Sequence, residues 1–413
     1  MTSKEAEGLL ARRGARLAEA ERVVAPILED VRRRGDAALI EYARRLDGLG
    51  DRPLAVSRRE MVQACEEVGA AFFSALDSAY RNIRRFAERQ VPQEFWIKFP
   101  DGHRAGQIVR PLDSVAAYVP GGRYPLPSTL LMTVVPAQAA GVRLVTAASP
   151  KPAREVLATA HFLRLERMFR VGGAQAIAAF AFGTETIPRA DRIVGPGNLY
   201  VAAAKKLLAG EVAIDFIAGP TEIVIVAADG DPRLLAADLL AQAEHDEEAA
   251  AILLTTSRRL ARAVAQEIER QLATLPTAPT ARAAIEHHGA IVLVRSLEQA
   301  LEFANRYAPE HLSLPDRSLL AGVRHAGSVF LGACSPEAAG DYASGPNHVL
   351  PTSGYARIRG GLSAADFVKV ITVQELTAAS LKRLAPAITT LARAEGLEAH
   401  ARSVEVRLDE RAR

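Results

Sequence analysis

Residues 222–249 read EIVIVAADGDPRLLAADLLAQAEHDEEA, and this stretch shows the pattern of most of the chain. The β-branched run EIVIVAA predicts a buried strand. A glycine and a proline interrupt the run, and the Ala- and Leu-rich sequence that follows predicts a helix over 232–249. The same order of strand and helix recurs at 114–141, 143–165, 250–272 and 290–308. Strands that alternate with helices predict an α/β fold with a parallel, doubly wound sheet.

The strand–helix pattern occupies two parts of the chain, which predicts two α/β units. Before them, the first hundred residues show apolar positions at helical spacing, and after them the C-terminal tail fits neither sheet pattern. In the tail we predict two helices followed by a strand-like alternation. We therefore expect four parts: an N-terminal helical segment (1–20), a discontinuous α/β domain (21–117 with 222–373), a second α/β domain (118–221) and a tail (374–413).

The composition of the chain is that of a globular protein. Its 413 residues are 49% hydrophobic and 24% charged, and the formal net charge is only +3. Basic and acidic residues are interleaved, which argues against a nucleic-acid-binding stripe. Cys65 and Cys334 lack a CxxC spacing, so neither a disulfide framework nor a thiolate zinc knuckle is indicated. With no signal-peptide core and no long apolar run, we expect a soluble cytoplasmic protein without a membrane partner.

Three glycine-rich stretches, at 118–129, 171–183 and 194–206, follow predicted strands. Their backbone N–H groups could receive an anion at a strand-to-helix turn. The nearest approach to GxGxxG, at 195–200, lacks the third glycine, so the dinucleotide fingerprint fails. Each stretch is therefore either a ligand-binding loop or a tight turn that needs glycine.

Two groups of polar residues suggest chemistry. Gln242 and His245 are three residues apart, so on a helix they would share a face and aim at one point. Glu310 and His311 are adjacent, after an Ala-Pro that ends a helix. Neighbouring titratable groups of this kind can serve as two separate acid–base catalysts.

Further candidates are Asp341 and His348, in a loop rich in Gly, Pro and Ser, and Glu395 and His400 near the C-terminus. A single histidine is more often a surface or core residue than a ligand. Together with the glutamine–histidine pair, however, Asp341 and His400 supply a mixed set of N and O donors that suits Zn²⁺. Sequence spacing does not show that these residues converge, so a metal site and a set of unrelated polar residues both stay open.

Ordered motifs along the chain resemble those of histidinol dehydrogenase, the family of NAD-dependent zinc enzymes that completes histidine biosynthesis. The resemblance runs from about residue 20 to residue 406 and is densest in YVPGGRYPLPSTLLMTVVPAQAAGV, VGPGNLYVAAAKK, DFIAGPTE, DLLAQAEHDEE, RYAPEHLSL, GDYASGPNHVLPT and EGLEAH. It implies two incomplete Rossmann-like domains and a C-terminal dimerisation segment that wraps around the partner in an intertwined homodimer. It also implies that L-histidinol is oxidised to L-histidine by two successive hydride transfers to NAD, via histidinaldehyde.

The resemblance also implies roles for individual residues. His311 would accept the alcohol proton and Glu310 would activate water for the second oxidation. The implied ligands of one zinc ion per subunit are Gln242, His245, Asp341 and His400. The implied NAD contacts are Tyr118, Gln175 and Asn198. The implied substrate contacts are Thr221, Gln242, His245, Glu310, His311, Asp341, His348, Glu395 and His400, the last with Glu395 reaching the site of the other chain.

Other functions remain possible at this stage. A dehydrogenase of the same fold could oxidise another small polar alcohol, such as a sulfonated diol. His348 and Glu395 argue against it, because they are the groups expected to contact an imidazole- and ammonium-bearing substrate. A zinc hydrolase would use Glu310 to activate water without a nucleotide. A non-catalytic metal-stabilised scaffold would leave the Glu310–His311 pair without an explanation.

Overall fold

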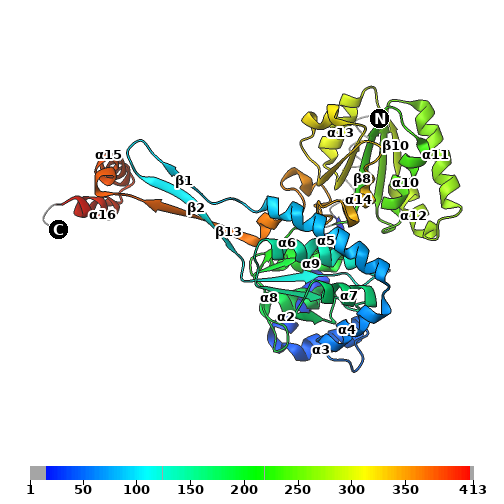
Figure 1. Cartoon of the computed structure of the whole chain (residues 1–413), viewed down its shortest axis with the longest axis horizontal. Helices are drawn as coiled ribbons and strands as arrows, with labels where there is room; N and C mark the ends of the chain where they lie inside the picture. Colours follow the sequence, from blue (N-terminus) through cyan, green and yellow to red (C-terminus); the bar gives the residue numbers. More distant parts are fainter. Residues whose placement is uncertain (1–14, 123, 218, 410–413) are drawn as a thin grey trace. The chain divides into compact units, whose positions relative to one another are not determined.

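The computed structural model describes residues 15–122, 124–217 and 219–409 (Figure 1). The chain forms two compact units. The first unit joins the chain up to Gln90 with Leu112–Phe367, and the second joins Val91–Pro111 with Val368–Arg413. Most of the helical segment predicted over 1–20 lies outside the described residues. Within the described ranges, no helix is long and apolar enough to cross a membrane.

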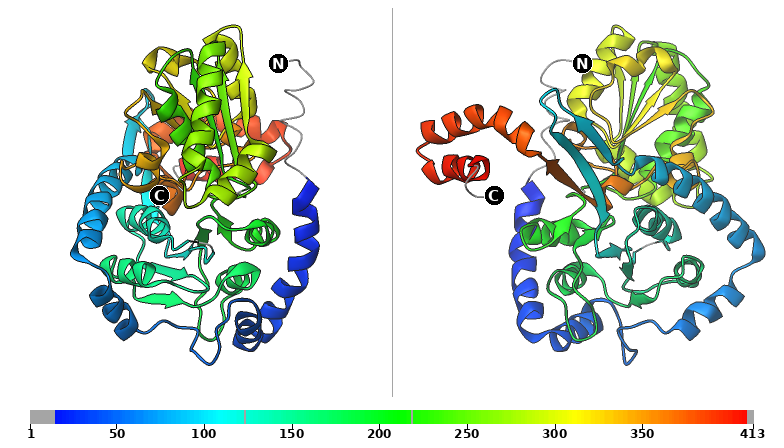
Figure 2. Two further views of the ribbon diagram at one scale, coloured as in Figure 1. Left: turned by 90° about the vertical axis from the view of Figure 1, so that its right-hand side faces the viewer. Right: turned by 60° about the vertical axis from the view of Figure 1, so that its left-hand side comes forward.

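The first five-stranded sheet has the order β5-β4-β3-β6-β7, and its strand pairs are all parallel. Its strands are β3 (Ser114–Tyr118), β4 (Leu144–Ala148), β5 (Arg167–Phe169), β6 (Arg192–Val194) and β7 (Ala213–Ile214). Its helices are α6 (Pro127–Ala139), α7 (Arg154–Phe162), α8 (Gly173–Phe182) and α9 (Leu199–Leu208). Figure 2 shows helices on both faces of the sheet. The strand order reverses between β3 and β6, and ligands of such sheets bind at the carboxyl ends of the strands at this switch point.

The described part of the first unit begins with helices, as the apolar periodicity predicted. They are α2 (Ala15–Arg34), α3 (Asp36–Leu46), α4 (Arg58–Glu67) and α5 (Ala70–Gln90). Val24, Leu28 and Val31 recur at helical spacing in α2 and are buried. They share a core cluster with residues of α8 and α9, so α2 covers these helices on one face of the first sheet.

The second five-stranded sheet has the order β10-β9-β8-β11-β12 and is also parallel. Its strands are β8 (Glu222–Ala227), β9 (Ala250–Thr255), β10 (Ala290–Leu293), β11 (His311–Leu314) and β12 (Ser328–Leu331). Its helices are α10 (Pro232–Ala243), α11 (Arg258–Leu272), α12 (Ala278–His288), α13 (Leu297–Tyr307) and α14 (Glu337–Tyr342). Ile223 and Ile225 pack on the α10 and α11 side, whereas Val224 and Val226 pack on the α13 side. This alternation is expected for a strand buried on both faces, and the predicted α/β fold with two parallel sheets is confirmed.

The second unit is an antiparallel sheet with two helices. Its strands, in the order β1-β2-β13, are β1 (Phe95–Lys98), β2 (Arg104–Pro111) and β13 (Val368–Glu375), and its helices are α15 (Ala378–Ala394) and α16 (Glu398–Leu408). The strand predicted from the alternation near the C-terminus is wrong, because α16 includes it. Ala401 and Val404 are buried and Val406 is exposed, which is the spacing of a helix face.

The four sequence ranges for the domains stay a proposal. We amend it in one respect. The packing of α2 on α8 and α9 argues for grouping the N-terminal helices with the domain at 118–221.

Candidate active site

Helix α10 carries Gln242 to the amino end of β8. The helix begins after Asp231, whose side chain accepts from the Arg233 N–H, and runs back along the sheet. Gln242 is fully buried, and its side-chain amide lies 2.5 Å from Thr221 Oγ1, just before β8. The prediction of one helix over 232–249 is wrong in extent, because α10 ends at Ala243. His245 therefore lies in the turn that follows, where its N–H still donates to the Gln242 carbonyl at 3.4 Å.

Glu310 and His311 stand beside Thr221 at the same edge of the sheet. Ala308, in the left-handed conformation, ends α13 before Pro309, and β11 begins at His311. Glu310 Oε2 lies 2.5 Å from Thr221 Oγ1 and accepts from the Glu222 N–H at 3.0 Å. Both Glu310 and His311 are buried. The amino ends of β8 and β11 thus bring together residues that are far apart in the sequence.

Burial decides the protonation of this pair. It lowers the pKa of His311 to about 4, so the imidazole is neutral near pH 7. The ring has one N–H, and Nδ1 lies 3.3 Å from the Glu222 carbonyl oxygen, so Nδ1 donates and Nε2 keeps the lone pair. His311 Nε2 is buried and has no hydrogen-bond partner among the described residues. Burial also raises the pKa of Glu310 well above its ordinary value.

Glu337 is a buried carboxyl at this site that the sequence analysis missed. Its Oε1 lies 3.7 Å from His311 Nδ1. One end of the Gln242 side-chain amide lies 2.6 and 2.9 Å from the two Glu337 carboxyl oxygens and 3.1 Å from His311 Nδ1. The Thr221 hydroxyl donates to Glu310 Oε2, so the threonine connects Gln242 with Glu310. The sequence could have revealed Glu337, because it lies four residues before Asp341 and residues at this spacing share a helix face.

The donor atoms at this edge fit a zinc ion. His245 Nδ1 lies 2.9 Å from the Ala241 carbonyl oxygen, which fixes the tautomer and leaves Nε2 as a ligand atom. Atoms of His311, Glu337 and Asp341 lie within 4.8 Å of one another, and Asp341 Oδ1 lies 3.9 Å from His311 Nε2. An amide oxygen, an imidazole nitrogen and a carboxylate form a mixed set that Zn²⁺ accepts.

His348 lies against the same carboxylate-bearing segment. Its Nδ1 lies 2.8 Å from the Asp341 carbonyl oxygen, so Nε2 carries the lone pair when the ring is neutral. Burial lowers the pKa of His348 and favours this neutral form. Glu395 and His400, by contrast, are exposed residues of the second unit, at the end of α15 and in α16.

The three residues implied for NAD lie at the carboxyl edge of the first sheet. Tyr118 ends β3, and its hydroxyl accepts from the Gly173 N–H at 3.1 Å. Burial raises the pKa of Tyr118 to about 12, so this hydroxyl keeps its proton. Asn198 caps α9 by accepting from the Tyr200 N–H at 3.1 Å. Gln175 lies buried in the first turn of α8.

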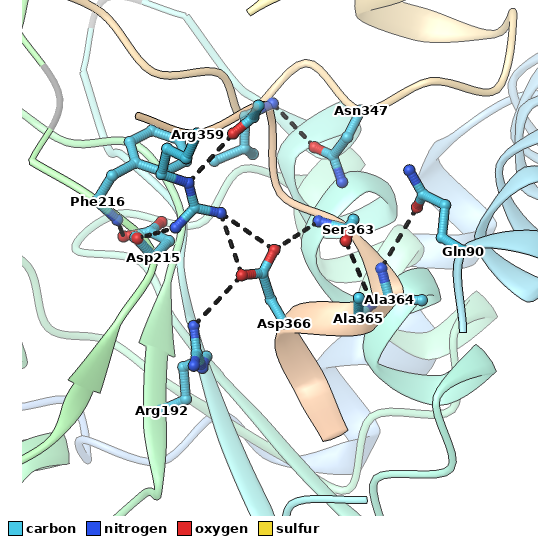
Figure 3. A network of polar contacts seen from close by, with 12 residues as sticks. Gln90, Arg192, Asp215, Phe216, Asn347, Arg359, Ser363, Ala364, Ala365 and Asp366 are labelled. Atoms are coloured by element: carbon cyan, nitrogen blue, oxygen red, sulfur yellow. Dashed lines mark hydrogen bonds and ion pairs between the residues drawn. The ribbon is translucent and has the colours of Figure 1, made fainter. Parts of the chain in front are cut away.

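The turn before Asn198 is held by a buried ion pair. Lys205 Nζ contacts Asp215 Oδ1 at 2.7 Å and the Gly195 carbonyl oxygen at 2.6 Å, while Asp215 Oδ2 accepts from the Gly195 N–H at 2.7 Å. Arg359 binds the Asp215 carbonyl oxygen and, at 3.1 Å, both oxygens of Asp366 (Figure 3). The network ties the switch point of the first sheet to the loop after the second sheet.

Comparisons with known proteins show the family to which the chain belongs. The histidinol dehydrogenase family model matches residues 10–408. The chain belongs to the histidinol dehydrogenase family. It is 49% identical to the histidinol dehydrogenase of Geobacillus kaustophilus, over 95% of this chain and 94% of that protein. It is 48% identical to that of Gluconobacter oxydans, over 98% and 97%. The crystal structure of histidinol dehydrogenase from Elizabethkingia anophelis, 38% identical, matches with a TM-score of 0.95 over 100% of this chain and 98% of that chain.

Membership of the histidinol dehydrogenase family confirms the resemblance on which the site residues were chosen and makes the chain an oxidoreductase of histidine biosynthesis. Within the first unit, five of the predicted site residues lie together at one edge of the second sheet: Thr221, Gln242, Glu310, His311 and Asp341. Glu337 lies with them. The first unit also groups the three loops implied for the cofactor at the carboxyl edge of the first sheet. Their roles in this family member are proposals.

Proposed function

We propose that the chain is a cytoplasmic, NAD-dependent zinc enzyme that oxidises L-histidinol to L-histidine via histidinaldehyde. The observation that carries the proposal is the buried, neutral His311, whose Nε2 lone pair faces Asp341 beside Glu310. A neutral imidazole at this position can accept a proton from an alcohol near pH 7. Membership of the histidinol dehydrogenase family supports this substrate.

Four electrons separate the alcohol from the acid, so the reaction has two oxidation steps. In the first, His311 Nε2 accepts the hydroxyl proton while the carbon loses a hydride, and His311 then releases this proton to solvent. Glu310, as the carboxylate, takes a proton from water, whose oxygen adds to the aldehyde. The neutral His311 accepts a proton from the resulting hydrate as the second hydride leaves. Zinc, held by Gln242, His245, Asp341 and His400, would fix the substrate, and two NAD molecules would accept the two hydrides.

The residues proposed for these steps lie at the edges of two different sheets. Thr221 and Glu310 lie at the amino edge of the second sheet, where His348 offers a further contact to the substrate. The loops of Tyr118, Gln175 and Asn198 lie at the carboxyl edge of the first sheet and would hold NAD. Glu395 and His400 would complete the substrate site of a second copy.

We also propose that the second unit forms a homodimer with another copy of the chain. Its three-stranded sheet exposes apolar side chains on both outer strands: Phe95, Trp96, Ile97, Val370 and Ile371. An exposed patch of this kind typically marks a protein interface. The same unit carries Glu395 and His400, so dimerisation would place these residues in the partner's site.

The test is the absorbance of NADH after histidinol and NAD are added to the zinc-loaded protein. We expect two NADH per histidinol and histidine as the product. Sulfonated diols, esters and amides are supplied separately, as the substrates that the alternative functions would require. Formation of NADH from the diol only, or hydrolysis without NADH, would contradict the proposal.

A further inference from the structure

Asp47 is a buried carboxylate that reaches the turn before α8 from the N-terminal helices. It follows the last residue of α3 and is 7% exposed. Its Oδ2 accepts from the Gly172 N–H at 2.9 Å and from Gln175 Nε2 at 3.0 Å. Hydrogen bonds that end on a charged group are stronger than neutral ones. One carboxylate oxygen therefore ties together the turn and the side chain implied to contact NAD.

The turn is built closely around this carboxylate. A Cβ atom on Gly172 would lie 3.0 Å from Asp47 Oδ1 and 2.7 Å from Pro150 Cβ. A larger residue at this position would therefore displace either the carboxylate or the proline. Gly173 has a φ of +59°, which favours glycine, and its N–H donates to the Tyr118 hydroxyl. The backbone and Asp47 thus fit each other without free space.

This contact fixes the orientation of the Gln175 amide. Nε2 points to Asp47, and Oε1 lies over Gly173, 2.7 Å from where a Cβ atom of that glycine would stand. An amide turned the other way would place its oxygen against the carboxylate, which is repulsive. Gln175 thus presents an oxygen, and only an acceptor, on the side of Gly173.

We propose that Asp47 is a positioning residue for the cofactor site, which acts by holding Gln175 with its amide oxygen toward the dinucleotide. This inference rests on the proposed function, because it takes NAD to bind at the Gln175 turn. A ligand group that donates a hydrogen bond, such as a hydroxyl or an amide N–H, suits this oxygen. Asp47 itself does not touch the cofactor.

The experiment compares Asp47→Asn, Gln175→Glu and the double variant in the zinc-loaded full chain. We expect each single variant to raise the KM and the Kd for NAD by roughly tenfold. The KM for histidinol and the zinc content should stay within about twofold. If Asp47 acts through Gln175, the double variant should bind NAD no more weakly than Gln175→Glu alone, because removing the charge of Asp47 also removes its repulsion of the introduced carboxylate. A merely structural role would instead give additive losses.

The matched control is Asp51→Asn, four residues away, with a fully exposed side chain that pairs with Arg44 at 3.8 Å. It should leave the KM for NAD unchanged. If the wild type is active and Asp47→Asn leaves the NAD affinity unchanged, the role of Asp47 is overturned but the proposed function is not. Additive loss in the double variant would also overturn it. Absence of NADH formation by the wild type would instead reject the proposed function.

Discussion

At the scale of single residues, burial acts in opposite directions on two neighbours. It raises the pKa of Glu310 and lowers the pKa of His311, because a buried site disfavours the charged form of either group. His311 therefore enters the reaction as a neutral base, whereas burial makes Glu310 hold its proton more tightly than an ordinary carboxyl group does. The two residues are adjacent in sequence but suited to different steps.

Glu310→Gln should separate the two oxidation steps. The amide has nearly the volume of the carboxyl but is no base, so oxidation of histidinaldehyde should slow by about 10²–10⁴-fold while the alcohol step is largely kept. His311→Asn should slow both steps. The measurement supplies histidinol and histidinaldehyde separately, with zinc content determined alongside. Equal impairment of Glu310→Gln on both substrates at full zinc occupancy would contradict this division.

Asp238 on α10 should make stability depend on pH. Burial raises its pKa from 3.8 to about 6, so the folded state binds this proton more tightly than the unfolded state. Wild type should therefore lose stability relative to Asp238→Asn as the pH rises from about 4 to about 6. Above pH 6 the variant should be more stable by roughly 1–3 kcal/mol.

The measurement for Asp238 is urea unfolding of both proteins between pH 4 and 8. Asp229→Asn, an exposed aspartate ahead of α10, serves as the control and should not change the free energy of unfolding. An Asp238→Asn difference that is the same at pH 4 and pH 7 would contradict the prediction.

At the scale of elements, turns and helix ends determine which side chains meet. Helix α10 returns from the carboxyl end of β8 and so delivers Gln242 to the amino end of the same strand. At the first sheet, the turn from β6 to α9 likewise determines where the Asn198 side chain lies. There Gly195 has a φ of +112°, and a Cβ atom would overlap the Tyr118 carbonyl oxygen.

Gly195→Ala should weaken NAD binding by displacing this turn and Asn198 with it. Strain at a positive φ costs on the order of 1–3 kcal/mol, so the melting temperature should also fall. Gly210→Ala is the matched control, because its Cβ atom would meet nothing within 4 Å. The KM for NAD and the melting temperature are measured for both variants. Equal behaviour of the two would show that the turn tolerates a side chain.

At the scale of the whole molecule, the four residues proposed as zinc ligands are divided between two compact units. Gln242, His245 and Asp341 belong to the first unit and His400 belongs to the second. A site completed by a partner's tail would make activity a property of the dimer.

Inactive His400→Asn and inactive His311→Asn chains should therefore complement each other when mixed and re-paired. One of the two sites in such a heterodimer carries neither substitution if the tail serves the partner. We expect roughly a quarter of the wild-type activity at equal mixing, because half of the re-paired dimers are mixed and each has one intact site. Absence of recovery despite confirmed heterodimers would show that each site is built within one chain.

Whether the sequence predicts a given element depends on how far apart in the chain the residues that stabilise it lie. The helices α2 to α5 and the strands β3, β4, β8 and β9 followed from periodicity, since each is decided by neighbours within a few residues. The end of α10 at Ala243 and the helical C-terminus did not follow. Polar residues after Gln242 and alternating Val404 and Val406 are compatible with either structure until packing selects one.

The sequence by itself determined the parallel α/β fold, the family and the residue types of the candidate site, because these depend on local patterns and ordered motifs. Only the tertiary structure decided that Glu310 and His311 meet Thr221 at the amino edge of β8, and that Glu337 joins them. It alone brought Asp47 to Gln175. Contacts of this kind, and the pKa shifts that burial causes, depend on which surfaces pack together, and no spacing along the chain encodes that.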